Sequence, residues 1–211
     1  MMTLERAEEI LRSLGIAKKF DEEEVQYEIE KQGFEKEVFC VGGISKICLV
    51  FYDADFVFKY SNPNAYSDGN EAEREIENYN KAVELGIEMF FPKTYLFCRI
   101  DGINIVYQEK IDYSVDESWE CQDQDKTYNL VHSMSIKDII STRDRFNIEG
   151  DKYNRSIDAV WVAFVVALYS KEIIDKLINF IHERKINDLH TGNLGYKNNK
   201  PVILDFSGYY C

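Results

Sequence analysis

The sequence contains few residues that interrupt regular structure, and it lacks a long hydrophobic run. Its 211 residues include only 3 prolines and 11 glycines, which excludes a collagen-like chain. Because 45% of the residues are hydrophobic, the chain can bury enough surface to fold, and intrinsic disorder is excluded. The longest apolar run, residues 159–169, is shorter than the roughly 20 residues that a membrane-spanning helix needs. We therefore expect a folded protein with no membrane partner.

The motifs of several common functional sites are also missing. The 5 cysteines are scattered without a CxxC pair, and the 3 histidines have no neighbouring ligand residues, so a zinc site is not expected. No Gly-x-Ser-x-Gly segment occurs, so a serine hydrolase is not supported. Residues 1–15 form a charged amphipathic segment rather than a secretory signal. Reduced thiols and a cytoplasmic location are therefore expected.

The sequence has fewer basic than acidic residues. The chain has 25 Lys and Arg residues against 38 Asp and Glu residues, a formal net charge of −13 at pH 7. Such a charge repels a phosphate backbone at long range, so duplex nucleic acid is not expected as a partner. A local group of basic residues could still bind a small phosphorylated ligand.

The first half of the sequence has the pattern of a sheet that carries one helix. An N-terminal helix is expected from Leu4 to Gly15, and the state of residues 21–30 is left open. Short runs of β-branched and aromatic residues predict five antiparallel strands, at residues 38–43, 46–52, 55–60, 94–100 and 103–110. The dipeptide Asp101-Gly102 predicts a hairpin turn between the last two strands.

A helix is expected between the third and fourth strands. A loop at residues 61–69 precedes it, and the helix itself covers residues 70–85 before Gly86 ends it. Helical spacing predicts an inward apolar face made of Ala72, Ile76, Tyr79 and Val83.

The second half of the sequence is mainly helical. Residues 111–126 are acidic and poorly periodic, as expected of a linker or exposed turn. Helices are predicted over residues 156–169 and 171–184, followed by a loop. A small hairpin then follows, in which residues 194–197 and 201–205 form strands around an Asn198-Asn199 turn.

The polar residues that suggest a chemistry lie in residues 186–208. An Asp-x4-Asn segment runs from Asp188 to Asn193 in the loop, and Asp205 ends the last strand. Phosphoryl transfer needs one carboxylate to orient or deprotonate the attacking hydroxyl. It also needs an amide oxygen and a second carboxylate to hold Mg²⁺ on the phosphates. These three residues could supply all of those groups to one cleft.

The sequence DLHTGN at residues 188–193 resembles the catalytic loop of the aminoglycoside phosphotransferase and choline kinase branch of the protein-kinase-like fold. DFSG at residues 205–208 is similar to the metal-binding motif of that family. The resemblance covers residues 38–208 and implies a single α+β domain with two lobes. Residues 1–110 would form the sheet lobe with an N-terminal helical extension, and residues 111–211 a reduced helical lobe. It also implies ATP and Mg²⁺ as cofactors, with Asn193 and Asp205 as the metal ligands.

The same resemblance assigns roles to an ion pair in the sheet-rich half. Lys59, near the end of the third strand, would contact the α and β phosphates. Glu75 on the following helix would hold that lysine, with Glu71 one turn away as the alternative. Taken singly, such a lysine is typical of an exposed position, and such a glutamate is typical of a solvated helix face.

Two further segments would surround the nucleotide in the family. The Gly42-Gly43 turn and Ser45 would form the loop that covers the phosphates, since glycines let backbone amides approach the oxygens. The hinge, with Glu109 and Ile111, would meet adenine through its backbone. A glycine pair alone is typical of an ordinary hairpin, so the hypothesis depends on the ordered set of motifs.

One histidine and the two tryptophans are expected to have structural roles and no direct role in catalysis or ligand binding. We expect His190 to brace the loop rather than act as a base. Trp119 and Trp161 are expected to be packing residues rather than stacking platforms.

The chain also departs from the family pattern. Ile186 and Asn187 replace the His-Arg or His-Gly that precedes the catalytic aspartate, which removes a bracing histidine but no reacting group. The sequence stops at Cys211, soon after Asp205, so we expect a minimal form of bacterial or phage type without the usual acceptor platform. The acceptor site would come from residues 111–170, from the N-terminal helix, or from a second copy in a homodimer.

Three functions remain open from the sequence. The first is an ATP- and Mg²⁺-dependent phosphotransferase that acts on an alcohol group of an unknown small molecule or protein. The second is a kinase-shaped regulator that binds a nucleotide or a protein partner without turnover. The third is transfer of a nucleotidyl group through the same residues.

Overall fold

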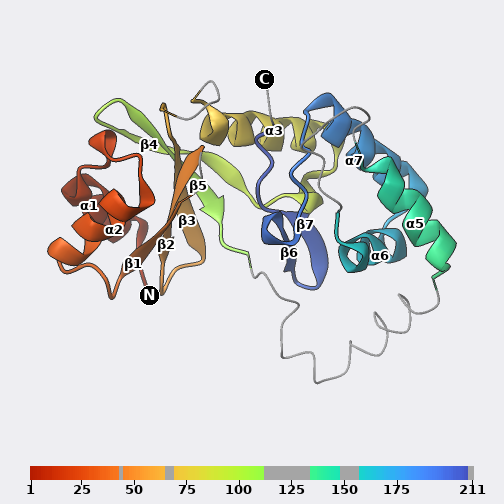
Figure 1. The fold of residues 1–211 in the computed structure, drawn as a ribbon, viewed down its shortest axis with the longest axis horizontal. Helices are drawn as coiled ribbons and strands as arrows, with labels where there is room; N and C mark the ends of the chain where they lie inside the picture. Colours follow the sequence, from red (N-terminus) through yellow and green to blue (C-terminus); the bar gives the residue numbers. More distant parts are fainter. Residues whose placement is uncertain (43–44, 65–68, 112–133, 148–156, 209–211) are drawn as a thin grey trace. The chain divides into compact units, whose positions relative to one another are not determined.

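The computed structural model describes residues 1–42, 45–64, 69–111, 134–147 and 157–208 (Figure 1). Within these ranges the chain forms six α-helices and seven β-strands, so the α+β class expected from the sequence is confirmed. The chain divides into two compact units. The first comprises Met1–Tyr79 and Lys93–Lys110, and the second comprises Asn80–Pro92 and Ile111–Tyr209.

The first unit is built on a five-stranded antiparallel sheet with the strand order β1-β2-β3-β5-β4. The strands lie where the sequence pattern predicts them: β1 (Val38–Gly42), β2 (Lys46–Phe51), β3 (Phe56–Ser61), β4 (Thr94–Ile100) and β5 (Ile103–Glu109). The predicted turn between β4 and β5 is also confirmed. Asp101 and Gly102 both have positive φ, 49° and 92°, as a tight hairpin turn requires.

Two N-terminal helices cover one face of this sheet (Figure 1). Helix α1 (Leu4–Leu14) ends as predicted at Gly15, whose left-handed conformation (φ 57°) stops the helix. A 3₁₀ turn, η1 (Ile16–Lys18), leads to helix α2 (Glu22–Lys31). The acidic segment whose state was open is therefore helical. Asp21 caps it by accepting hydrogen bonds from the backbone N–H groups of Glu23 and Glu24.

Strand alternation explains why the two faces of the sheet differ. Successive side chains of a strand point to opposite faces. In β3, Phe56, Phe58 and Tyr60 join the apolar core beneath α1 and α2, which leaves Lys59 on the other face.

The same core surrounds Cys40, and burial of this residue raises the pKa of its thiol to about 12. That cysteine therefore stays protonated at neutral pH.

Helix α3 (Glu71–Leu85) presents a polar stripe rather than the predicted apolar face. Val83, expected inside, is 48% exposed, and Ile76 and Tyr79 are only half-buried. The buried residues of the helix are instead Glu71, Ala72, Arg74, Glu75, Asn78 and Ala82. These positions have helical spacing, but most of the side chains are polar, so a search for apolar periodicity misses them.

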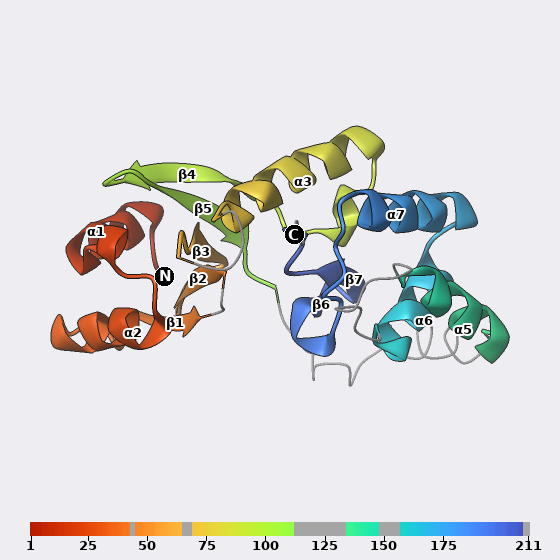
Figure 2. The same ribbon diagram turned by 45° about the horizontal axis from the view of Figure 1, so that its top comes forward.

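The second unit combines helices with a short hairpin (Figure 2). Its described elements are η2 (Glu88–Phe90), α5 (Ile136–Arg145), α6 (Ala159–Leu168), α7 (Lys171–Glu183), η3 (Thr191–Asn193), β6 (Leu194–Lys197) and β7 (Lys200–Ile203). The two predicted helices correspond to α6 and α7. The predicted hairpin is present as well, with Asn198 and Asn199 at positive φ in its turn. Its second strand ends at Ile203, however, so Asp205 follows the last strand instead of ending it.

Aromatic side chains form much of the core of the second unit. The ring of Phe91 lies 4.9 Å from that of Phe206 and 5.4 Å from that of Phe180. Trp161 is 1% exposed, and its indole N–H donates a hydrogen bond to the carbonyl oxygen of Val202 (3.2 Å). Its predicted packing role is therefore confirmed. Trp119 and residues 112–126 of the expected linker lie outside the described residues.

The most apolar helix, α6, is 10 residues long. In the part of the chain that the structure describes, no helix combines the length and hydrophobicity needed to cross a bilayer.

Candidate functional site

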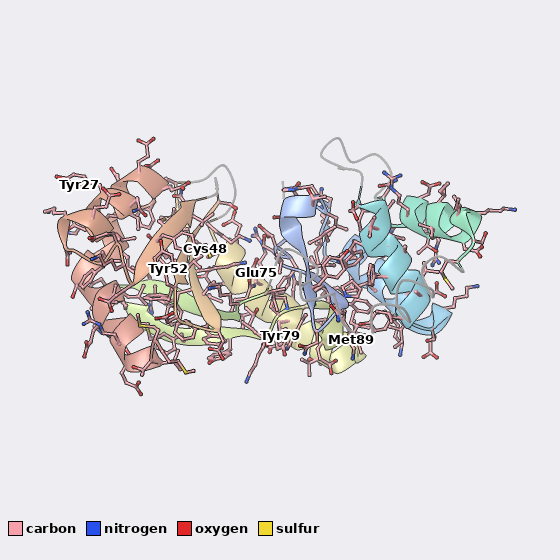
Figure 3. All side chains as sticks on the ribbon, turned by 90° about the horizontal axis from the view of Figure 1, so that it is seen from below. Tyr27, Cys48, Tyr52, Glu75, Tyr79 and Met89 are labelled. Atoms are coloured by element: carbon pink, nitrogen blue, oxygen red, sulfur yellow. The ribbon has the colours of Figure 1, made fainter. Side chains whose placement is uncertain are left out.

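The predicted site residues fall into two groups, one in each unit. In the first unit, the ammonium group of Lys59 on β3 lies 3.2 Å from Oε1 and 3.1 Å from Oε2 of Glu75 on α3. Figure 3 shows Glu75 on the α3 ribbon. The expected contact between a strand lysine and a helix glutamate is therefore present, and Glu75 rather than Glu71 makes it.

The ion pair belongs to a larger polar cluster. The ammonium group of Lys46, on β2, lies 2.8 Å from Oε1 of Glu75. The side-chain amide of Gln108, on β5, donates to Oε2 of Glu75 (3.2 Å) and to the hydroxyl of Thr94 on β4 (3.4 Å). The Glu75 side chain is fully buried, whereas those of Lys46 and Lys59 are 8% and 10% exposed. The described donors to this carboxylate thus include two cationic side chains and one amide.

A second set of hydrogen bonds fixes the start of α3 against the sheet. The hydroxyl of Ser61, the last residue of β3, donates to Glu73 (2.5 Å) and accepts from the backbone N–H of Ala72 (2.9 Å). Asn104 on β5 donates to the other carboxylate oxygen of Glu73 (3.1 Å). These contacts satisfy a donor of the first helical turn and set the position from which Glu75 reaches the lysines.

The glycine turn has a packing role at its first residue. A side chain on Gly42 would collide with Glu22 of α2, so the absence of a Cβ lets the end of β1 approach that helix. Gly43 lies outside the described residues. The backbone carbonyl of Ser45 accepts a hydrogen bond from the N–H of Asn62 (2.8 Å), which holds the start of β2 beside the end of β3.

The predicted hinge coincides with the boundary between the units, which falls between Lys110 and Ile111. Glu109 ends β5, and its backbone N–H donates to the carbonyl oxygen of Lys93 (2.9 Å). Glu109 and Ile111 are both half-buried.

In the second unit, the loop after α7 is closed by its own side chains. The amide nitrogen of Asn193 donates to the backbone carbonyl oxygen of Asp188 (2.8 Å). This bond uses the nitrogen of the Asn193 amide and not its oxygen. Leu189, between the two residues, is 3% exposed and anchors the loop in the core. Asp188 itself is half-buried.

A backbone hydrogen bond connects this loop to the last candidate residue. The N–H of Leu204 donates to the carbonyl oxygen of Asn193 (2.8 Å), and Asp205 follows directly in the sequence. The carboxylate of Asp205 accepts a hydrogen bond from Ser207 (3.3 Å), while Phe206 between them is fully buried. The structure therefore brings Asp188, Asn193 and Asp205 into one local assembly.

His190 braces the loop, as predicted. Its Nδ1 accepts a hydrogen bond from the backbone N–H of Gly192 (3.0 Å), and its Nε2 lies 3.7 Å from the carboxylate of Asp188. Ile186 and Asn187, which precede the aspartate, are 2% and 3% exposed. They support the loop from inside rather than lining its surface.

The donor set of the second group suits magnesium better than zinc. Among the described residues, no three His, Cys, Asp or Glu side chains come together as a metal site. Mg²⁺ differs from zinc in that it keeps several waters and needs only one or two carboxylates besides substrate phosphates. The carboxylate of Asp205 and the amide oxygen of Asn193 are ligands of the required type.

Replacement of Gly208 with alanine is expected to destabilise the second unit. Gly208 has φ 74°, and a Cβ there would overlap the backbone carbonyl oxygen of Arg184. Left-handed backbone alone costs an L-residue about 1–2 kcal/mol, and a rigid backbone clash adds to it, so we expect a loss above about 2 kcal/mol in urea unfolding.

Gly86→Ala is the matched control for this prediction. Gly86 lies in the same unit and has a similar φ of 70°, but an added Cβ would meet nothing within 4 Å. The difference between the two variants isolates the clash. Equal destabilisation by both substitutions would show that the tight contact at Gly208 does not exist.

Sequence reasoning missed two members of the first group, Lys46 and Gln108. Both lie on the same face of the sheet as Lys59. Lys59 pairs with Cys48 and Val106, and Lys46 and Gln108 are each two residues from one of these partners. Alternation from those two positions would have indicated both residues, once the register was known.

Comparisons with known proteins do not assign the chain to a family. No protein-family model matches this chain, and a search of curated proteins gives no significant match. The function proposed below therefore depends on the chain's own residues.

Proposed function

We propose that this protein is an ATP- and Mg²⁺-dependent phosphotransferase of the protein-kinase-like type, acting on an alcohol group of an acceptor. The observation that carries the proposal is the buried ion pair of Lys59 and Glu75. A buried charge pair is costly to desolvate and contributes little net stability, so its placement on a strand and a facing helix fits a functional role. An ATP-dependent reaction and reduced thiols fit a cytoplasmic location.

Within this proposal the first unit holds the nucleotide. Lys59 donates to phosphate oxygens as a compact cation with three N–H groups. Glu75 fixes the position of that cation, so binding orders no flexible lysine side chain. Ser45 and Glu109, together with Ile111 at the start of the second unit, supply backbone contacts to the phosphates and the base.

The second unit supplies the chemistry. The hydroxyl oxygen of the acceptor attacks the γ-phosphorus, the bond from that phosphorus to the β–γ bridging oxygen breaks, and ADP leaves. Asp188 orients the hydroxyl and takes its proton. Asn193 and Asp205 would hold Mg²⁺, which supplies neutralising charge on the phosphate oxygens when bound.

Mg²⁺ with ATP is expected to stabilise the folded protein. A ligand present at about 100 times its dissociation constant stabilises the folded state by about 2.7 kcal/mol, which raises the melting temperature of a chain of this size by several degrees. The shift is measured by thermal unfolding with and without Mg-ATP. Lys59→Met should abolish most of it, whereas Lys18→Met, at an exposed position in the same unit, should keep it.

The outcomes separate the candidate functions. Stabilisation together with release of ADP supports a phosphotransferase, and self-modified protein analysed by mass spectrometry would distinguish an added phosphoryl group from a nucleotidyl group. Stabilisation without any turnover supports a nucleotide-binding regulator. A melting temperature that Mg-ATP does not change, in the wild type at millimolar concentration, would contradict the proposal.

A further inference from the structure

Helix α5 of the second unit consists of 10 residues, and none of them is buried. Figure 2 shows this helix at the edge of the unit, beside α6. An isolated helix shorter than about 12–15 residues is at best marginal in water, because starting a helix is costly. Short helices in proteins are therefore stabilised mainly by packing an apolar face. The exposed faces of α5 thus need to be considered together with its contact to α6.

The contact between α5 and α6 lies toward the C-terminal end of α5. The side-chain Nε of Arg143 donates to the backbone carbonyl oxygen of Ile157 (3.0 Å). The ring of Phe146, the residue that caps α5, lies 6.0 Å from the ring of Trp161, and Phe146 is almost fully buried. The packed side of α5 is therefore the side that carries Arg143 and Phe146.

Two isoleucines form an exposed apolar stripe on the same helix. Ile136 is 74% exposed and Ile140 is 50% exposed. Residues four apart are neighbours on a helix surface, so the two side chains lie one above the other. Because each residue advances by about 100° around the axis, this stripe lies beside the packed side of α5 rather than within it. Large aliphatic side chains at this spacing are typical of a seam between two helices.

One charge of each sign borders the isoleucine stripe. Lys137 and Asp144 are seven residues apart, so they lie on the same edge of the stripe. Both are exposed, and neither side chain has a hydrogen bond or ion pair with any residue in the described ranges. Their positions do not favour the helix itself, since a cation near the start and an anion near the end oppose the macrodipole. A partner outside the helix would give both charges a favourable position.

We infer that α5 is a homodimer interface, in which two copies of this chain pack their α5 helices antiparallel along the isoleucine stripe. If the two helices cross near Ile140, Lys137 of one copy lies opposite Asp144 of the second copy, and two-fold symmetry repeats the pair. Each charge then also lies near the favourable end of the other helix. A parallel pair would bring each residue level with its own copy, so like charges would meet.

The charge of the chain suits this face to self-association. Two copies with a formal charge of −13 repel each other at long range. Helix α5 does not add to that repulsion, since its three basic residues and two acidic residues give it a net charge of +1. A pair of such short helices buries less than the roughly 1,200 Å² of a standard interface, so we expect a dimer that dissociates on dilution. The inference is independent of the proposed function, because α5 carries none of the candidate site residues.

Sedimentation velocity over a range of protein concentrations tests the interface. The weight-average mass of the wild type should rise from the 24.7 kDa of the monomer toward twice that value. Ile140→Glu should raise the dissociation constant of the dimer at least about tenfold, because it brings two carboxylates into an apolar contact. Val83→Glu is the matched control and should leave the dissociation constant unchanged. It adds the same charge at a similarly exposed apolar position of the same unit.

Charge reversal tests the antiparallel orientation. Lys137→Glu and Asp144→Lys should each raise the dissociation constant by about tenfold, because each replaces two attractive pairs with two repulsive ones. The two variants change the net charge of the chain in opposite directions, so a general charge effect cannot weaken both. The double variant Lys137→Glu/Asp144→Lys restores attraction in both pairs and should dimerise as the wild type does. These exposed positions keep the inference falsifiable if Ile140→Glu does not fold.

Three results would overturn the inference. A wild type that stays monomeric at all concentrations would do so, and a lower melting temperature of Ile140→Glu would then indicate that the stripe packs within its own chain. A dimer that Ile140→Glu and Val83→Glu affect equally would show that the copies associate through another surface. Single reversals that weaken the dimer without recovery in the double variant would exclude the antiparallel pairing.

Discussion

Glu75→Ala is expected to lower the free energy of unfolding by about 3–5 kcal/mol, because it leaves two mostly buried ammonium groups without the carboxylate that they share. Such a loss is a large part of the roughly 5–15 kcal/mol that keeps a typical domain folded. The side chain is also fully buried, so its removal opens a void beside Gln108. Equilibrium unfolding in urea measures the change.

Two further variants make this expectation specific. Glu77→Ala removes a carboxylate from an exposed position of the same helix, and it should change stability by no more than about 0.5 kcal/mol. Glu75→Gln keeps the size and one acceptor oxygen but removes the charge, so its effect should lie between the other two. A Glu75→Ala protein as stable as Glu77→Ala would contradict the buried cluster.

Asp205→Asn is expected to reduce Mg²⁺-dependent ATP turnover by at least about 100-fold, the loss typical of removing one group that stabilises developing charge. Asparagine keeps the shape of the side chain, and its oxygen can still accept the hydrogen bond from Ser207. The fold should therefore be retained, with a melting temperature close to that of the wild type. A coupled assay of ADP formation measures turnover.

The same variant also tests binding, whether or not an acceptor is known. Because Asp205 would hold the metal, Asp205→Asn should remove the part of the ATP-induced thermal shift that requires Mg²⁺. Asp138→Asn, at an exposed position on α5, is the matched control and should behave as the wild type. Full turnover and a full Mg²⁺-dependent shift in Asp205→Asn would remove this residue from the proposed mechanism.

Lys59 and Asp205 belong to different units. Comparison of Lys59→Met with Asp205→Asn therefore tests whether binding of one ligand depends on both residues. If Lys59→Met removes most of the stabilisation by Mg-ATP and Asp205→Asn removes its Mg²⁺-dependent part, a single ligand depends on both groups of residues. If only one variant does so, the two groups act separately, and the phosphotransferase mechanism is lost.

The regular elements of the sheet could be predicted because their signals are local. The Asp101-Gly102 turn and the alternating runs on either side specify a hairpin without reference to the rest of the chain. Helix α2 could not be predicted in the same way. Its apolar signal consists mainly of Val25 and Ile29, which become buried only because a sheet face lies beneath them.

The two groups of candidate site residues also differ in whether their contacts are local in the sequence. The loop from Asp188 to Asn193 could be predicted as a candidate because its polar residues form one short motif, and a hydrogen bond joins the two ends of that motif. The contact of Lys46 joins β2 to α3, across 29 positions of the chain. No short motif contains both residues, so this cation was found only in the structure.

The sequence by itself determined the order of the strands, of their hairpin turns and of helices α1, α3, α6 and α7, because backbone preferences and side-chain alternation act over a few residues. Only the tertiary structure decided that Glu75 rather than Glu71 meets Lys59, that Lys46 joins them, and that Val83 faces outward. For the part of α3 that belongs to the first unit, the physical reason is that it meets a sheet face carrying two ammonium groups. Charge complementarity with that face, rather than apolar periodicity, selects which side of the helix is buried.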